Sequence, residues 1–157
     1  MKIGVLVYVK KDDKYLMIKR NKKNNDFHEG YWVAPGGKRE KNETIRTAAE
    51  RELKEETGLS SNTLKFLGFL NFPDLGNSPF NDEWLGFVFL CKNYHGTLIE
   101  ESPEGLLKWI KKEKMMKLKM WEGDYFFTGL ILEEKKFDIQ LTYDGNRLVD
   151  KKIKLID

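Results

Sequence analysis

Three glutamates within residues 37–59 have the type and spacing of a cation site. Glu52, Glu55 and Glu56 stand at relative positions i, i+3 and i+4, and in a helix these positions fall on one side within about one turn. Unpaired charge in a low-dielectric environment is very costly, and Arg51 alone cannot neutralise three carboxylates. A hard divalent cation with oxygen ligands, Mg²⁺ or Mn²⁺, is therefore expected.

The residues around these glutamates predict a helix with well-marked ends. Asn42 is expected as its N-cap, Glu43 falls in the first turn, and Gly58 ends it. A solvated charged face is the ordinary interpretation of such a helix. At about 100° per residue, however, Glu52 and Glu56 lie on the apolar side of the helix and the solvated face lies opposite. We therefore expect two of the carboxylates to face the core, with the third on its flank.

Further elements are expected on both sides of this helix. The pair Gly36-Gly37 after Pro35 predicts a tight turn where the backbone can approach a ligand or metal closely. Hydrophobic patterning and turn residues predict a hairpin at 3–9 and 15–18, further strands at 64–70, 84–90, 106–110 and 137–143, a helix at 125–132, and a final strand ending near 156.

An acidic residue and several aromatic residues outside 37–59 are candidates for a ligand pocket. Asp124 precedes the predicted helix 125–132, so an N-cap is its ordinary role. Alternatively, its carboxylate accepts hydrogen bonds from the N1 and N2 donors of a guanine-like edge while Trp121 stacks on the ring. Phe27, Trp32 and Trp84 either pack in the core or line the same pocket. The sequence leaves both interpretations open for each of these residues.

Basic residues near the predicted glycine turn are candidates for phosphate contacts. They are Lys38, Arg39, Arg20 and Lys23, and a solvated surface is the alternative for each.

Composition limits the class of protein. The chain has 157 residues, of which 40% are hydrophobic, and a net charge of +3, which predicts a single domain over 1–157 and a small polyanionic ligand, with no stable nucleic-acid partner. The lone Cys91 indicates a reducing, cytoplasmic compartment. No apolar run approaches the roughly 20 residues that span a bilayer, so no membrane association is expected. The sequence leaves monomer and homodimer open.

The spacing within 37–59 resembles the Nudix box. It reads Gly37, five residues, Glu43, seven residues, Arg51-Glu52-Leu53, one residue, Glu55-Glu56, one residue, Gly58-Leu59. The resemblance implies an α/β fold, an α/β/α sandwich with a mixed β-sheet, and Mg²⁺-dependent hydrolysis of a nucleoside diphosphate linked to another group.

The resemblance also implies roles for individual residues. Glu52, Glu55 and Glu56 match the metal ligands of the family, and the Gly37 backbone usually contributes another. Glu43 and Arg51 match positions that orient the helix and its carboxylates through a salt bridge. A glutamate just before the strand 106–110 often completes the metal shell or acts as the base, and Glu104 is the best match, with Glu101 as the fallback.

The last third of the chain resembles the mutator-type branch, the oxidised-purine nucleoside triphosphatases. The shared features are Met120-Trp121, Gly123-Asp124, the aromatic helix and the final hairpin. Val33 departs from an asparagine in the vertebrate members, and Gly123-Asp124 departs from a pair of acidic residues. The resemblance implies that a nucleoside triphosphate such as 8-oxo-dGTP is split into monophosphate and pyrophosphate, with Glu56 or Glu104 taking the proton of the attacking water.

Two kinds of alternative remain open. Another Nudix substrate, such as a nucleotide sugar, a dinucleoside polyphosphate or a 5′-triphosphate RNA end, would keep the helix and change the pocket. A non-catalytic nucleotide-binding module would keep the pocket without turnover, and a hydrolysis assay would distinguish the two.

Overall fold

The computed structural model describes residues 1–21 and 30–157, so Lys23 and Phe27 lie outside the described residues. The elements in chain order are β1 (Lys2–Lys11), β2 (Lys14–Arg20), β3 (Trp32–Val33), β4 (Gly36–Lys38), α1 (Ile45–Thr57), β5 (Leu59–Ser60), β6 (Lys65–Phe72), β7 (Trp84–Cys91), β8 (His95–Gly96), β9 (Glu101–Ser102), β10 (Gly105–Lys111), the 3₁₀ helix η1 (Lys112–Lys117), α2 (Asp124–Leu132), β11 (Lys136–Asp144) and β12 (Arg147–Ile156).

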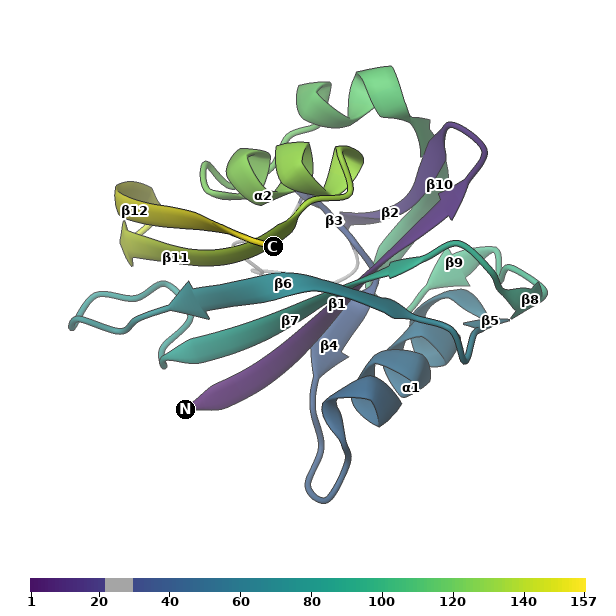
Figure 1. The fold of residues 1–157 in the computed structure, drawn as a ribbon, viewed down its shortest axis with the longest axis horizontal. Coiled ribbons are helices and arrows are strands. Elements are labelled where there is room, and N and C mark those ends of the chain that lie inside the picture. Colours follow the sequence, from purple (N-terminus) through teal and green to yellow (C-terminus); the bar gives the residue numbers. More distant parts are fainter. Residues whose placement is uncertain (22–29) are drawn as a thin grey trace.

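One mixed sheet contains ten of the strands in the described part of the chain, in the order β12-β11-β6-β7-β1-β2-β10-β9, with β3 beside β2 and β4 beside β1 (Figure 1). β1 runs parallel to β7, and β11 runs parallel to β6. The other neighbours are antiparallel, including the expected hairpin of β1 and β2. The central strand β1 therefore contacts both halves of the sheet.

The two faces of the sheet are covered by different helices, with α1 on one side and α2 with η1 on the other (Figure 1). Val5, Val7 and Val9 of β1 pack with the apolar side of α1 in one core. Tyr8, between them, belongs to a second core that includes residues of α2 and β11. Alternation along β1 thus fills both cores, because successive side chains of a strand point to opposite faces. The expected α/β/α arrangement with a mixed sheet is confirmed.

The ends of α1 only partly match the expectation. Gly58 ends the helix in a left-handed conformation, with φ of 83°, as predicted. The N-cap is Thr44, whose hydroxyl accepts a hydrogen bond from the Thr47 N–H at 3.0 Å. The prediction of Asn42 was wrong: Asn42 has φ of 71° and forms part of the preceding turn, a conformation that asparagine tolerates well.

The glycine pair does not form the predicted turn. Gly36 and Gly37 lie in β4, which pairs with β1, and neither has a positive φ. A Cβ added at Gly36 would collide with the Val5 carbonyl oxygen, and one at Gly37 would overlap the Glu52 carboxylate. Close approach of a strand and a carboxylate, rather than a turn, therefore requires these glycines.

The remaining predicted elements are confirmed with small changes of boundary. The strands expected around 64–70, 84–90, 106–110 and 137–143 are β6, β7, β10 and β11, and the helix expected at 125–132 is α2. Among residues 1–21 and 30–157, no helix is both long and apolar enough to cross a bilayer.

Candidate active site

A cavity of about 610 Å³ lies between α2 and the sheet and reaches the inner side of α1. Its charged lining residues are Arg20, Lys38, Glu52, Glu56, Glu104 and Asp124. Its aromatic lining residues are Tyr8, Trp32, Phe72, Phe80, Trp84, Trp121, Phe127 and Tyr143. One cavity therefore combines acidic and basic groups suited to phosphate chemistry with a large apolar surface suited to a flat ring.

Two of the three helix glutamates face this cavity as the spacing predicted. Glu52 is 9% exposed and Glu56 is 7% exposed. Burial raises the pKa of both carboxyl groups above the usual range. The Ser102 hydroxyl donates a hydrogen bond to Glu56, which partly offsets the effect of burial on the pKa of Glu56. Nothing in the sequence pattern had indicated Ser102.

Glu104 also lines the cavity, and its neighbours fix it there. The Glu104 carboxylate forms an ion pair with Arg20 at 3.2 Å, and its backbone N–H donates to the Ser102 hydroxyl at 3.3 Å. Ser102 thus bridges Glu56 and Glu104, and the Glu104 charge also raises the pKa of Glu56. Glu101 is exposed and does not line the cavity, so the geometry favours Glu104 over the fallback residue.

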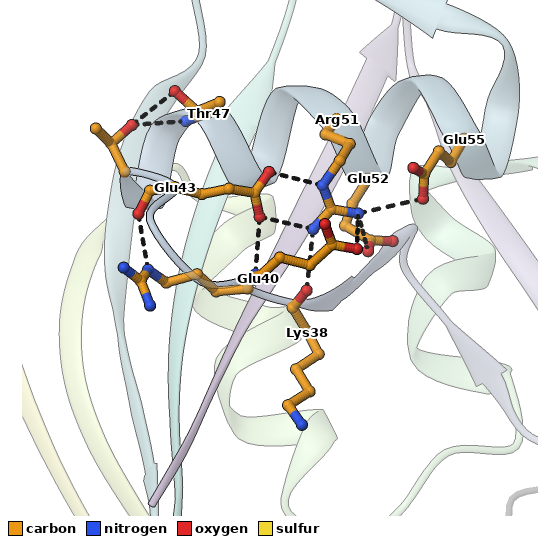
Figure 2. Close-up of polar contacts among 9 residues, drawn as sticks. Lys38, Glu40, Glu43, Thr47, Arg51, Glu52 and Glu55 are labelled. Atoms are coloured by element: carbon orange, nitrogen blue, oxygen red, sulfur yellow. Dashed lines mark hydrogen bonds and ion pairs between the residues drawn. The ribbon is translucent and has the colours of Figure 1, made fainter.

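Arg51 holds the helix against the strand and loop that precede it (Figure 2). Its Nε and Nη2 donate to the two Glu43 oxygens at 2.7 and 2.8 Å, and Nη2 also donates to the Lys38 carbonyl at 3.1 Å. Nη1 donates to Glu52 at 2.7 Å and to Glu55 at 3.2 Å. Hydrogen bonding to Arg51 lowers the pKa of Glu43 to about 2. The guanidinium therefore ties β4, the loop and two helix carboxylates together.

Replacing Arg51 by lysine should destabilise the fold although the charge is kept. A lysine cannot form the planar two-pronged contact with Glu43 and reach the Lys38 carbonyl as well. We expect the free energy of unfolding to fall by about 1.5–3 kcal/mol, as measured by urea denaturation. The exposed Arg147→Lys is the matched control and should change it by less than about 0.5 kcal/mol. Equal effects of the two changes would contradict this role.

Glu55 departs from the simplest expectation. Its side chain is 58% exposed and contacts Arg51, and it does not line the cavity. Within the described residues, no three His, Cys, Asp or Glu side chains are grouped as a ready metal site. Arg51 contacts Glu52 and Glu55. The donors nevertheless fit a hard cation: Glu52, Glu56 and Glu104 offer only oxygen atoms to one cavity, and their charges repel one another.

The basic candidates separate into two groups. Lys38 and Arg20 line the cavity, Arg20 being paired with Glu104. Arg39 instead donates to the Glu43 carbonyl at 2.8 Å and does not line the cavity. The prediction of a phosphate contact from Arg39 is therefore not supported by its position. Lys23 lies outside the described residues.

The aromatic candidates in the described residues, Trp32, Trp84 and Trp121, all line the cavity. Trp121 is 6% exposed and contacts the ring of Tyr143 edge-on, with centroids 5.3 Å apart. Phe80 comes from the β6–β7 loop, and its ring centroid lies 5.7 Å from that of Trp121 and 6.0 Å from that of Tyr143. The sequence does not single out Phe80 and Tyr143, since a loop phenylalanine and a strand tyrosine are usually packing residues.

Asp124 is the first residue of α2, and it is not the N-cap. Gly123 occupies that position without a side-chain cap hydrogen bond. The Asp124 carboxyl is partly buried and lines the cavity, where desolvation raises its pKa from 3.8 to about 7. The ordinary N-cap interpretation was therefore wrong. A carboxyl group with a strongly raised pKa in a cavity is typical of a ligand-binding site.

The Asp124 pKa predicts a stability that depends on pH. Between about pH 4 and pH 7 the folded protein keeps the Asp124 proton while the unfolded chain releases it, so this group lowers stability as pH rises through that window. The asparagine of Asp124→Asn does not titrate, so its contribution to stability does not change with pH. Relative to wild type, we expect the variant to gain up to about 4 kcal/mol at pH 8 and nothing at pH 4. Urea denaturation at several pH values would check this, and a difference independent of pH would contradict it.

Comparisons with known proteins agree with this geometry. A family model described as the NUDIX domain matches residues 1–128. The Nudix hydrolase YvcI from Bacillus subtilis is 34% identical over 113 residues, covering 72% of this chain and 68% of that protein. The oxidized purine nucleoside triphosphate hydrolase from Mus musculus is 35% identical over 115 residues, covering 73% of this chain and 71% of that protein.

A solved structure extends the likeness to almost the whole chain. The mutator MutT protein from Bacillus halodurans superposes with a TM-score of 0.85 at 27% identity, covering 98% of this chain and 97% of that one. The MutT-like fold thus includes β11 and β12, which follow the residues matched by the family model. The chain therefore belongs to the Nudix family of hydrolases, enzymes of small nucleotide substrates that generally use divalent metal ions.

Proposed function

We propose that this protein hydrolyses a purine nucleoside triphosphate to the monophosphate and pyrophosphate with Mg²⁺, and that it removes oxidised nucleotides such as 8-oxo-dGTP. The observation that carries the proposal is that Glu52, Glu56 and Glu104 line the same cavity as Asp124 and three tryptophans. The name of the Mus musculus relative supports the same substrate class. We also propose that residues 1–157 form one domain, since β11 pairs with β6 and Tyr143 lines the cavity.

The charged part of the cavity supplies the proposed hydrolytic chemistry. Glu52, Glu56 and Glu104 would hold the ion, together with Glu55 once it leaves Arg51 and with the Gly37 backbone. When bound, the ion would neutralise phosphate charge and make the attacking water more acidic. Manganese would serve the same role because it accepts the same oxygen ligands.

Individual residues would then perform separate tasks around the phosphates. Glu56 would take the proton from the attacking water, with Glu104 as the other candidate. Ser102 would hold Glu56 in place, and Lys38 and Arg20 would contact the phosphate oxygens. Arg51 would orient Glu52 without contacting the substrate.

The aromatic part of the cavity would bind the base. Trp32, Trp84 and Trp121 offer flat apolar surfaces for a purine ring. Asp124, when ionised, would accept hydrogen bonds from a guanine-like edge, and its raised pKa would make this recognition sensitive to pH near 7.

A product assay tests the proposal directly. Purified protein is incubated with 8-oxo-dGTP, dGTP, ADP-ribose, a dinucleoside polyphosphate or a 5′-triphosphate RNA, with Mg²⁺, Mn²⁺ or a chelator. We expect metal-dependent release of pyrophosphate and a monophosphate, with the highest kcat/KM for the oxidised purine nucleotide. Higher kcat/KM for one of the other compounds would move the protein to another Nudix activity. Binding without turnover of any compound would favour a non-catalytic module.

A further inference from the structure

Tyr8 lies at the place where the central strand meets the candidate base-binding acid. Gly4, Leu6 and Tyr8 are the residues of β1 that alternate toward the cavity. Tyr8 is 2% exposed. Tyr8 belongs to the same core as Phe127 and Ile131 of α2, so its ring lies on the face of the sheet that α2 covers.

Two residues of α2 face the Tyr8 hydroxyl. Asp124 and Thr128 are four residues apart, which places them one above the other on the same side of a helix. Thr128 is fully buried, its hydroxyl donates to the Met120 sulfur at 3.9 Å, and its side chain partly offsets the rise in the Tyr8 pKa. Burial, followed by the Asp124 charge, raises the pKa of Tyr8. The phenol therefore stays protonated at physiological pH and remains a hydrogen-bond donor beside an acceptor.

Two apolar residues and a second phenol also line the cavity. Val33 and Ala34, which also line the cavity, have no polar side-chain atom. Tyr143 is the other phenol near Asp124, but its hydroxyl already accepts the Gly123 N–H at 2.8 Å and so helps to shape the start of α2. A purine that offers donors to Asp124 also carries an acceptor next to them when position 6 is a carbonyl.

We propose that Tyr8 is a specificity-determining residue whose hydroxyl donates to the O6 carbonyl of a 2-amino-6-oxopurine while Asp124 accepts from N1–H and the 2-amino group. This inference rests on the proposed function and deepens it. The Asp124 and Tyr8 pair reads the edge of the base as two donors followed by one acceptor. The apolar side chains of Val33 and Ala34, which also line the cavity, leave this contact to Tyr8.

The test compares dGTP with 6-thio-dGTP, which keeps N1–H and the 2-amino group but replaces O6 by a poor acceptor. Wild type should prefer dGTP by roughly tenfold in kcat/KM. Tyr8→Phe keeps the ring and removes the hydroxyl, so it should lower kcat/KM for dGTP by roughly tenfold and reduce the preference to less than about threefold. Tyr143→Phe, the matched control, should lower kcat/KM for dGTP and for 6-thio-dGTP by the same factor.

The outcomes separate this inference from the proposed function. An equal loss for both nucleotides in Tyr8→Phe, or no loss for dGTP, would overturn the role of Tyr8 while leaving the hydrolase intact. No pyrophosphate release by wild type from either nucleotide would overturn the proposed function. Equilibrium binding of dGMP and 6-thio-dGMP to Tyr8→Phe in the cold provides the same comparison if the variant is unstable at the assay temperature.

Discussion

Glu56→Gln is expected to lower kcat by a factor of about 10² to 10⁴, the contribution typical of a lost general base. The glutamine has the same shape and still contacts the Ser102 hydroxyl, so the fold should remain intact. Its amide removes the charge that burial already disfavours at this position. Pyrophosphate release from 8-oxo-dGTP with saturating Mg²⁺ measures the loss, and circular dichroism with a melting curve checks the fold.

The matched control for this change is Glu50→Gln. Glu50 lies on the same helix and the change removes the same charge, but Glu50 does not line the cavity. We expect its kcat to stay within about twofold of wild type. Pyrophosphate release by Glu56→Gln at the wild-type rate would show that neither the proton transfer nor the metal site depends on this carboxylate, and the proposed mechanism would fail.

Asp124→Asn is expected to abolish most of the discrimination between bases. An asparagine presents one acceptor and one donor where the carboxylate presents two acceptors, so one of the guanine donors faces an amide N–H. A site built to hydrogen-bond its substrate loses much more than a nonspecific apolar site when a partner is missing. We expect the ratio of kcat/KM for 8-oxo-dGTP to that for dATP to fall roughly 100-fold.

The control for Asp124→Asn is Glu133→Gln at the other end of α2. Glu133 is paired with Lys135 at 2.8 Å and its side chain is 60% exposed, so the same charge change there should leave the ratio unaltered. The two Asp124 experiments support one another: higher stability at pH 8 together with weaker discrimination is typical of a residue kept for function at a cost in stability. An unchanged ratio would instead indicate that Asp124 has no part in recognising the base.

Local geometry explains why helix α1 could be predicted. The 3.6-residue period fixes Glu52 and Glu56 on one side of any helix formed by this stretch, and Gly58 ends it because glycine adopts the left-handed conformation at little cost. The N-terminal boundary was missed because Asn42 and Thr44 have similar capping chemistry two residues apart. Which of them caps depends on the loop, where Arg51 binds Glu43 and fixes the entry of the chain into the helix.

The partners of the charged residues could not be predicted. Arg51 binds Glu43, Glu52, Glu55 and a backbone carbonyl at once, and this arrangement needs β4 to lie beside the helix. Glu55, which its spacing places on the flank of the helix, is exposed and contacts Arg51. A single side chain that satisfies several neighbours is decided by their positions in space, and sequence distance carries little information about those positions.

The sequence by itself determined that the chain contains a Nudix box, that Glu52 and Glu56 face inward, and that β1, β2, α2 and β11 form. Each of these depends on residue types and spacings within one short stretch of the chain. The tertiary structure decided the composition of the cavity. Tyr8, Phe80 and Tyr143 line one cavity through the parallel pairing of β1 with β7 and of β11 with β6. Ser102 reaches Glu56 through the antiparallel pairing of β9 with β10 and of β10 with β2. Such pairings join segments far apart in the chain, and no local pattern specifies which distant strand a given strand will choose.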